Sequence, residues 1–511
     1  MIDLDVTQKP KAPDLETTDL QMKSGNDSWI RKVPLLRAFA APSTVATTPV
    51  ADLNEWLPWQ AKGSLLRKSE RKAGHGFYAP YVEGSPTSTR QAEILNSTLI
   101  AAPTGAAGVS IGRDVMSRTG VNSDPITGYN STPKLVTSTG VVVLGDVGSG
   151  KSSGVKCMYV IRPLVLKQRR VVIFDKKDEG GEGEYSELCR HYGHNPLRFT
   201  LDGSGEKLNL LDPLLSTRGD DGQDNHLELL YTVPSLVREG MSADEWERKA
   251  IRLAYRSLRK AFESGRVSTL DDLVQRLGIL ENGDRSLVGM STGAKERLHQ
   301  AGLSIRWVFD DLMDSYGSVF DGETSKRVRL DDRITSFDIS QLPDAGPSIP
   351  TVMGVANLWL LATARKQRGW KTNVINEEAW YIMATELAKQ AKSNTKLARG
   401  LGLSNVYVMH KGSDTPVGSP GMSVIQEAHT IHIYRQNRPI EAAWCASTFG
   451  FEQETARIIE TLANGHYIFK VGAGNPETEV EHIRSDWEKL MTNTDSALST
   501  AGPGAMVEVA A

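Results

Sequence analysis

One short segment constrains the fold of this chain more than any other part of its sequence. From residue 141 it runs VVVLGDVGSGKSSG, which is four apolar residues, a glycine-rich loop and the start of a helical pattern. The loop matches Gly-x-x-x-x-Gly-Lys-Ser, in which glycines let consecutive backbone N–H groups turn inward toward an anion. The segment therefore predicts a strand, a phosphate-binding loop and a helix in succession, which is typical of α/β proteins with a mostly parallel sheet.

The loop carries the groups that a nucleoside triphosphate and its magnesium ion need. The Lys151 ammonium suits the β- and γ-phosphates, and the Ser152 hydroxyl suits a coordination place on Mg²⁺. The positive end of the following helix adds to the attraction for phosphate. A simple glycine-rich turn is the poorer interpretation, because a strand precedes the loop and a helix follows it. We therefore predict ATP and Mg²⁺ binding by Gly145, Asp146, Val147, Gly148, Ser149, Gly150, Lys151, Ser152 and Ser153.

A second element with carboxylates is needed to hold Mg²⁺ and to activate water. The best candidate is NVINEEAW from residue 373, where a short apolar strand ends in paired acids. We expect Glu377 to reach the Mg²⁺ shell through water and Glu378 to orient the hydrolytic water as the catalytic base. Two alternatives stay open: the acids decorate a helix N-terminus, or Asp175, after the expected strand 171–174, is the base.

Polar residues at other strand ends are further candidates. His410 follows the expected strand 405–409, a position from which a side chain can sense the γ-phosphate, although a structural histidine fits equally well. Arg399 and Arg435 are candidate arginine fingers for a neighbouring subunit, and solvent exposure is the simpler explanation for either one alone.

The pattern of apolar runs divides the chain into segments. Strands are expected at 141–144, 171–174, 334–337, 374–375, 405–409, 430–434 and 467–471. We expect disordered tails at 1–28 and 491–511, a small N-terminal domain at 29–130, an ATPase domain at 131–221 and 316–490, and an α-helical insertion at 222–315. In the insertion, Ser242 and Glu245 suggest a capping box that begins a helix.

Composition excludes several classes of protein. The chain has 59 basic and 62 acidic residues, so overall charge does not steer it onto nucleic acid or an anionic membrane. Its three cysteines are widely spaced, which excludes a disulfide framework and fits a reducing cytoplasm. The uncharged run 345–364 is long enough to span a bilayer, but its glycines, prolines and polar residues predict a loop and a buried helix instead. A small basic cluster at 62–72 is expected to be a solvated helix face.

Several motifs occur together in a characteristic order. They are the loop at 145–152, FDKKDEGGEGEYSEL from Phe174, KLNLLDP from Lys207, SYGSVFDGE from Ser315, RITSFDIS from Arg333, EEAW from Glu377, GLSNVYVMHKGSD from Gly402 and ETARIIETLANGHYIF from Glu454. With GVSIGRDVMSRTGVNSDP from Gly108, this series resembles the motor ATPases of conjugative type IV secretion systems, in the FtsK/HerA branch of RecA-like P-loop NTPases. The resemblance covers residues 108–485.

The chain departs from that family at three places. Glu377 stands where the family has Asp, His410 stands where a Gln is common, and the segment between Asp175 and Glu184-Tyr185 is stretched. The first of these departures bears on how well the chain uses Mg²⁺.

The resemblance implies a RecA-like motor that hydrolyses ATP for DNA or protein transfer, or for assembly of a secretion apparatus. It also implies a hexamer of this chain, membrane components of a secretion or conjugation complex as partners, DNA as a further candidate partner, and a cytoplasmic position at the inner face of the membrane. The alternatives are a DNA translocase or coupling protein of the same superfamily and a nucleotide-binding scaffold that hydrolyses poorly. Coupling proteins usually carry N-terminal membrane helices, and their absence from this sequence favours the first interpretation.

Overall fold

The computed structural model describes residues 108–216, 225–262, 267–281, 285–330, 333–472 and 474–492, together with two short strands nearer the N-terminus. Those strands, β1 (Leu66–Arg67) and β2 (Ala79–Pro80), pair antiparallel within a separate unit of residues 1–96. The expected tail 1–28, most of the basic cluster 62–72 and residues 493–511 of the expected tail 491–511 lie outside the described residues, and Met491 is the last residue of a helix. The fold that follows belongs to the unit of residues 97–511.

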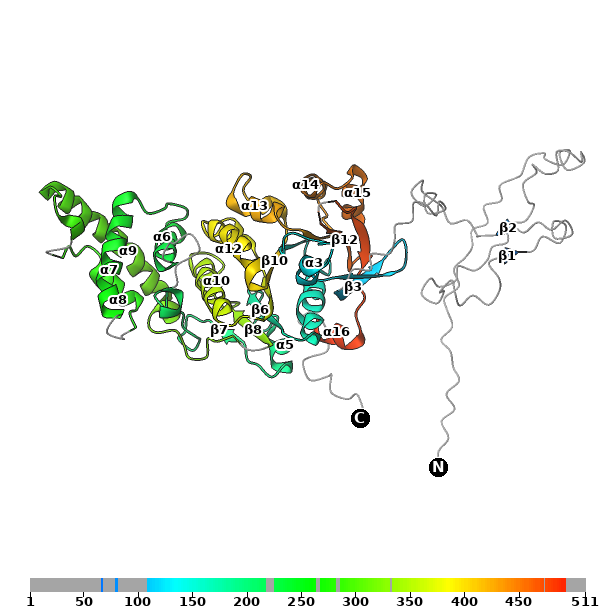
Figure 1. Ribbon diagram of the computed structural model, residues 1–511, viewed down its shortest axis with the longest axis horizontal. Coiled ribbons are helices and arrows are strands. Elements are labelled where there is room, and N and C mark those ends of the chain that lie inside the picture. Colours follow the sequence, from blue (N-terminus) through cyan, green and yellow to red (C-terminus); the bar gives the residue numbers. More distant parts are fainter. Residues whose placement is uncertain are drawn as a thin grey trace, which may run out of the picture. The chain divides into compact units, whose positions relative to one another are not determined.

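A sheet of eleven strands forms the centre of this unit, in the order β4-β3-β13-β12-β11-β5-β10-β9-β6-β8-β7 (Figure 1). The strands are β3 (Val109–Asp114), β4 (Gly120–Ser123), β5 (Val141–Leu144), β6 (Arg169–Asp175), β7 (Leu197–Arg198), β8 (Ile334–Asp338), β9 (Lys371–Asn376), β10 (Leu403–Met409), β11 (Thr430–Tyr434), β12 (His466–Val471) and β13 (Thr478–Glu481). The strands from β11 to β7 are parallel, and β12, β13, β3 and β4 extend the sheet antiparallel. The predicted α/β fold with a mostly parallel sheet is confirmed.

All seven expected strands are present, and β5 and β11 have the expected bounds. The pattern of apolar runs did not predict β7 or β13. β7 has only two residues, and β13, with the sequence TEVE, has a single apolar residue. β3 and β4 lie in the region 29–130, which was expected to form a separate domain. They instead continue the main sheet through the pairing of β3 with β13.

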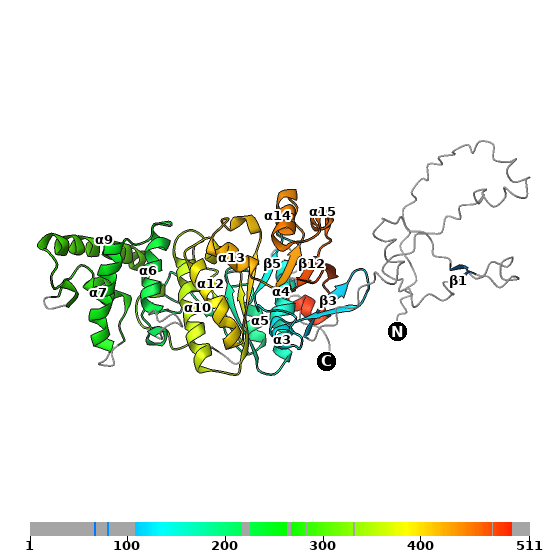
Figure 2. The same cartoon turned by 45° about the horizontal axis from the view of Figure 1, so that its top comes forward.

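Helices cover both faces of the sheet (Figure 2). They are α3 (Pro125–Asn130), α4 (Lys151–Val155), α5 (Ser186–His191), α6 (Asn225–Val237), α7 (Glu245–Phe262), α8 (Leu270–Arg276), α9 (Thr292–Phe320), α10 (Ser348–Lys366), α11 (Trp380–Met383), α12 (Leu387–Leu401), α13 (Pro420–Gln426), α14 (Pro439–Phe449), α15 (Gln453–Thr461) and α16 (Asp486–Met491). On β5, Val141 and Val143 pack with the helix after the loop and with α5. Val142 and Leu144 pack with α13 and α14 on the opposite face, as the two-residue period of a strand requires.

Helices α6 to α9 lie beyond the end of the sheet that carries β7 and β8 (Figure 1). The expected capping box at Ser242 and Glu245 is wrong, because α7 begins at Glu245 and the reciprocal bonds lie two residues later. The Glu247 N–H donates to Asp244 Oδ1 (2.7 Å), and the Asp244 N–H donates to Glu247 Oε2 (3.1 Å). Asp244 and Glu247 therefore cap the helix in place of the expected pair, and Glu247 also forms an ion pair with Arg238 at 2.9 Å.

Helix α10 corresponds to the uncharged run 345–364. Its residues from Ser348 to Ala364 are buried, apart from the half-buried Asn357, so the prediction of a buried helix is confirmed. Within the described ranges, no helix combines the length and the apolar character needed to cross a membrane.

Candidate nucleotide site

The loop after β5 has the backbone shape that its glycines predict. Gly148 (φ +75°) and Gly150 (φ +92°) adopt left-handed conformations that favour glycine. Gly150 also has little room for a side chain, because a Cβ there would lie 3.0 Å from the backbone nitrogen of Gly465. The Gly465 N–H in turn donates to the Ser149 carbonyl at 3.0 Å. Contacts from the C-terminal part of the sheet thus hold the loop in place.

The neighbouring strand β11 holds the other side of the loop. The Asp146 N–H donates to the Arg435 carbonyl (3.0 Å), and Asp146 Oδ2 accepts from the Asn437 N–H (2.7 Å). Asp146 therefore works as an anchor of the loop, a role that the phosphate-binding pattern does not reveal.

A cavity of about 920 Å³ opens at this carboxyl edge of the parallel strands. Residues of the loop and the first turn of α4, including Ser152 and Ser153, form its floor. Glu377, Glu378 and His410 line one side. The other side comes from a C-terminal segment that carries Asn464, Gly465, His482, Arg484, Lys489 and Thr492. The fold thus brings the predicted loop, the paired acids and the predicted sensor to one cavity.

A chain of polar contacts joins the loop lysine to the second acid. Lys151 Nζ lies 3.1 Å from His410 Nδ1, and His410 Nε2 lies 3.0 Å from Glu378 Oε1. An ammonium can only donate, so Nδ1 of His410 accepts and Nε2–H donates to the carboxylate. Burial lowers the pKa of Lys151, whereas the charges of Glu377 and Glu378 act in the opposite direction.

Glu378 is held in an unusual conformation. Its φ of +51° lies in the left-handed region, which is uncommon for a residue with a side chain and typical of functional sites. Trp380 Nε1–H donates to Glu378 Oε2 at 3.0 Å, which fixes the carboxylate from its other side. Burial by itself raises the pKa of Glu378, but the bond from His410 and the charge of Lys151 outweigh it, and the pKa lies below its ordinary value. Glu378 is therefore an ionised carboxylate at neutral pH.

Glu377 has the opposite electrostatic character. It is buried, and burial followed by the nearby charge of Glu184 raises its pKa to about 7. The Tyr185 hydroxyl donates to Glu377 Oε1 at 2.5 Å. Glu184 pairs with the buried Lys156 (3.1 Å) and with Lys177 (3.3 Å). Burial and the charge of Glu184 outweigh the opposite effect of the Tyr185 hydrogen bond on the pKa, so Glu377 ionises near neutral pH.

The structure does not bring Asp175 into the cavity. Its side chain is completely buried, and Asp175 Oδ2 accepts from the Tyr185 N–H at 2.8 Å. The backbone of Gly183 covers it, since a Cβ there would lie 2.2 Å from the same oxygen. Burial raises the pKa of Asp175 well above its ordinary value. The geometry therefore gives no support to Asp175 as the alternative base and fits a structural role beneath the segment 183–185.

Neither candidate arginine finger lines the cavity of its own chain, as far as the described residues define it. Arg399 is exposed and donates to the Thr137 carbonyl at 3.0 Å. Thr137 lies before the start of β5, and hence at the edge of the sheet opposite to the cavity. Arg435 follows β11 and contacts the loop through its backbone carbonyl. Their action on a neighbouring subunit stays a prediction.

Sequence reasoning missed Tyr185, Lys177 and the C-terminal side of the cavity. The pair Glu184-Tyr185 was visible as a motif, but nothing in the spacing linked it to Glu377, which lies far along the chain. His482 and Arg484 follow a short polar strand with no periodic signal, so only the folded sheet shows where they lie.

Comparison with known proteins supports the fold independently. No protein-family model matches the chain, and no curated protein matches its sequence. The solved structure of VirB4 from Thermoanaerobacter pseudethanolicus matches with a TM-score of 0.61 and 16% identity, covering 76% of this chain and 100% of that chain. The plasmid coupling protein TrwB in complex with ADP and Mg²⁺ matches with a TM-score of 0.44 and 13% identity, covering 68% of this chain and 86% of that chain. TrwBΔN70, unbound, matches with a TM-score of 0.44 and 14% identity over similar shares of 68% and 85%. The chain therefore has the RecA-like NTPase fold of VirB4, as its motifs predicted.

Proposed function

We propose that this protein is a Mg²⁺-dependent ATPase that drives a conjugative or type IV secretion apparatus, in DNA or protein transfer or in assembly. The observation that carries the ATPase assignment is the contact chain from Lys151 through His410 to Glu378 at the mouth of the glycine loop. It joins a group for the phosphates, a group that can sense them and a carboxylate for water. The VirB4 fold and the ordered motifs support the secretion assignment.

The residues present suit a magnesium–nucleotide complex. Hydroxyl and carboxylate oxygens are the ligands that Mg²⁺ prefers, and both Ser152 and Glu377 line the cavity. Bound Mg²⁺ would neutralise charge on the β- and γ-phosphates. The loop N–H groups and Lys151 would bind those phosphates, Ser152 would hold the ion directly, and Glu377 would hold it through water.

Glu378 would orient the attacking water and accept its proton, because it is ionised and its carboxylate is fixed by two donors. In the structure Lys151 donates to His410. When a γ-phosphate attracts Lys151, His410 loses that partner. The geometry of the hydrogen bond from His410 to Glu378 can then change. His410 thus links occupancy of the phosphate site to the position of the catalytic carboxylate.

In this role the chain would act as a hexamer with membrane components of the apparatus, and DNA remains a candidate substrate. An arginine from the neighbouring subunit, Arg399 or Arg435, would complete each site. Such a residue is worth on the order of 10³–10⁵ in rate.

The test is phosphate release from ATP by the purified full chain, with and without Mg²⁺, over a range of protein concentrations. We expect Mg²⁺-dependent hydrolysis whose specific activity rises with concentration. Mixing an Arg399→Ala or Arg435→Ala chain with a Lys151→Ala chain should restore activity at mixed interfaces for the arginine that acts in trans. An absence of hydrolysis at every concentration would reject the ATPase, and activity that is independent of concentration would reject the shared site.

A further inference from the structure

The cavity has a second side that the proposed chemistry does not use. In the sheet, β10 and β9, which His410 and Glu377 directly follow, lie on one side of β5. β11, β12 and β13 lie on the other side, and the residues that follow β13 line the cavity there. The phosphate-binding loop leaves β5 between the two sides. If the terminal phosphate of the proposed ligand meets the acids, the side of the cavity lined by the residues after β13 is left for its remaining part.

Three attachments fix this second side to the phosphate-binding segment. The His482 N–H donates to the Gly465 carbonyl (3.0 Å), and Gly465 itself bonds the loop. Arg162, just after the helix that begins with the loop, donates to the Ile483 carbonyl (2.6 Å) and to the Glu488 carboxylate (2.7 Å). The segment 482–488 is thus held at a set position relative to the phosphates.

The chemistry of this side differs from that of the acidic side. Within residues 464–492, as far as they are described, the groups that line the cavity include no carboxylate. Burial, and then the charges of Arg162 and Arg484, lower the pKa of His482 to about 3, so its imidazole is neutral at physiological pH. Arg484 lines the cavity and donates to Thr492 Oγ1 at 3.0 Å through one of the five N–H donors of its planar guanidinium. Lys489 is engaged with Asp486 at 3.0 Å.

We propose that His482 and Arg484 form the nucleoside end of the site and contact the base and ribose of the bound nucleotide. A neutral ring and a planar guanidinium offer surfaces for stacking on a base and donors for its ring nitrogens or the ribose hydroxyls. This inference rests on the proposed function, and it assigns to the C-terminal segment the recognition of the nucleoside rather than of the terminal phosphates.

The experiment compares two ligands that share the triphosphate and differ in the nucleoside. Calorimetry on the full chain measures the Kd of Mg²⁺-ATP and of Mg²⁺-tripolyphosphate. We expect Arg484→Ala and His482→Ala each to weaken ATP binding tenfold or more and to change tripolyphosphate binding less than twofold. Lys151→Ala should weaken both ligands. Arg457→Ala, an exposed arginine on α15 that does not line the cavity, is the matched control and should change neither.

The outcomes separate this inference from the proposed function. If the parent chain binds neither ligand, the proposed function fails. If it binds both and the two variants lose ATP and tripolyphosphate equally, or lose neither, the nucleoside assignment fails. Arg484→Lys guards against a folding artefact because it keeps the charge but lacks the planar group, and ATP affinity should stay at least fivefold below the parent. Full recovery by lysine would indicate a simple charge contact with phosphate and overturn the assignment.

Discussion

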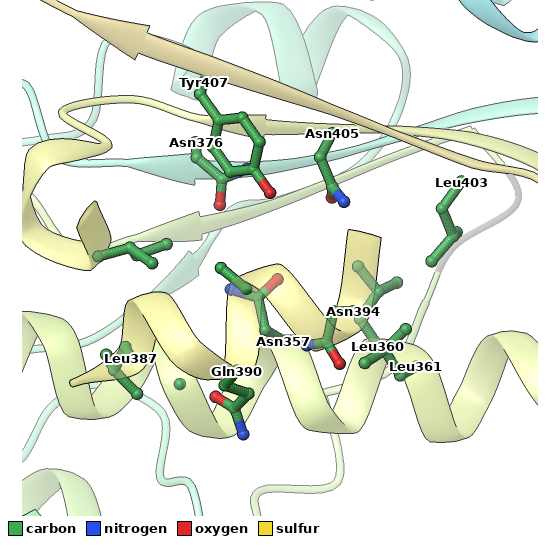
Figure 3. A pocket seen from close by; sticks show the side chains of 13 residues that line it. Asn357, Leu360, Leu361, Asn376, Leu387, Gln390, Asn394, Leu403, Asn405 and Tyr407 are labelled. Carbon is green, nitrogen blue, oxygen red and sulfur yellow. The ribbon is translucent and has the colours of Figure 1, made fainter. Parts of the chain in front are cut away.

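Two cavities of this protein lie close to β9 and β10 and have opposite character: residues of these strands line the smaller one, and residues that follow them line part of the larger one. The larger cavity measures about 920 Å³, and its lining includes charged groups. A second cavity of about 30 Å³, the volume of about one water molecule, lies between α10, α12 and the strands β9 and β10 (Figure 3). Its polar lining is neutral and consists of Asn357, Asn376, Gln390, Asn394, Asn405 and Tyr407.

Two consecutive residues at the end of β9 line different cavities. Asn376 is the last residue of β9 and faces the small cavity, whereas Glu377, the next residue, lines the large one. Inside the sheet Asn376 Nδ2 donates to the Val374 and Val406 carbonyls, at 3.4 Å each. Buried amides can be satisfied by such carbonyls, whereas a buried charge requires a counter-charge or a ligand. The comparison teaches that two consecutive residues can differ in purpose: the polar side chain inside the strand is neutral and bonds the sheet, and the one just after the strand is an acid in the large cavity.

The largest expected effect comes from removing the loop lysine. Lys151→Ala should weaken Mg²⁺-ATP binding a hundredfold or more, because it removes the mobile charge for the β- and γ-phosphates, and hydrolysis should disappear. Its fold should survive, since a buried amine is replaced by a methyl group. Equilibrium binding and thermal melting check both points, and unchanged affinity would show that the large cavity is not a phosphate site.

Glu378→Gln should separate binding from catalysis. The amide cannot accept a proton, so turnover should fall by about 10²–10⁴ while the Kd for ATP stays within threefold of the parent. Asp175→Asn, which changes a carboxyl outside the cavity, should reduce turnover much less. Single-turnover hydrolysis at saturating ATP measures this, and a larger loss at Asp175 than at Glu378 would reverse the assignment of the base.

The raised pKa of Glu377, about 7, predicts a specific pH dependence. The folded chain keeps a proton on Glu377 that the unfolded chain releases above its ordinary value near 4.5, so this group's contribution to stability is lost as pH rises toward 7. Because Mg²⁺ needs the ionised form, ATP binding with Mg²⁺ should tighten by about tenfold between pH 6 and 8.

Tyr185→Phe sharpens this prediction, because the Tyr185 hydrogen bond lowers the pKa of Glu377. Without that bond the midpoint should move to higher pH. Tyr192→Phe, a half-buried tyrosine that does not line the cavity, is the control. Affinity measured in steps of half a pH unit checks the midpoint, and a flat profile in the parent chain would contradict the role of Glu377.

The smallest effect is expected in the small cavity. Asn357→Ala removes a side-chain bond to the Met353 carbonyl (2.9 Å) and should lower the free energy of unfolding by about 1 kcal/mol. ATP affinity and turnover should not change, because this residue does not line the large cavity. Denaturant unfolding and steady-state kinetics measure the two effects, and a clear loss of turnover would show that the cavities are coupled through β9.

The fold was largely predictable from local pattern. The glycine loop, the apolar runs of the parallel strands and the uncharged run of α10 each identify an element without reference to the rest of the chain. Predictions were less successful at the start of α7, where the capping pair is Asp244 and Glu247 rather than Ser242 and Glu245, and at β13, whose sequence TEVE pairs with β12 and β3. A polar segment of this kind has no preference strong enough to be visible alone.

By itself the sequence determined the glycine loop, the position of the paired acids after a strand and the α/β class, because backbone conformation and hydrophobic period act over a few residues. Only the tertiary structure decided the surroundings of those acids. It left Glu377 buried against Tyr185 with a raised pKa, placed Glu378 against His410 and Trp380 with a lowered one, and enclosed Asp175 beneath Gly183. It also brought His482 and Arg484 to the cavity from the far end of the chain. Burial and charge depend on neighbours that are distant in sequence, and no local pattern records them.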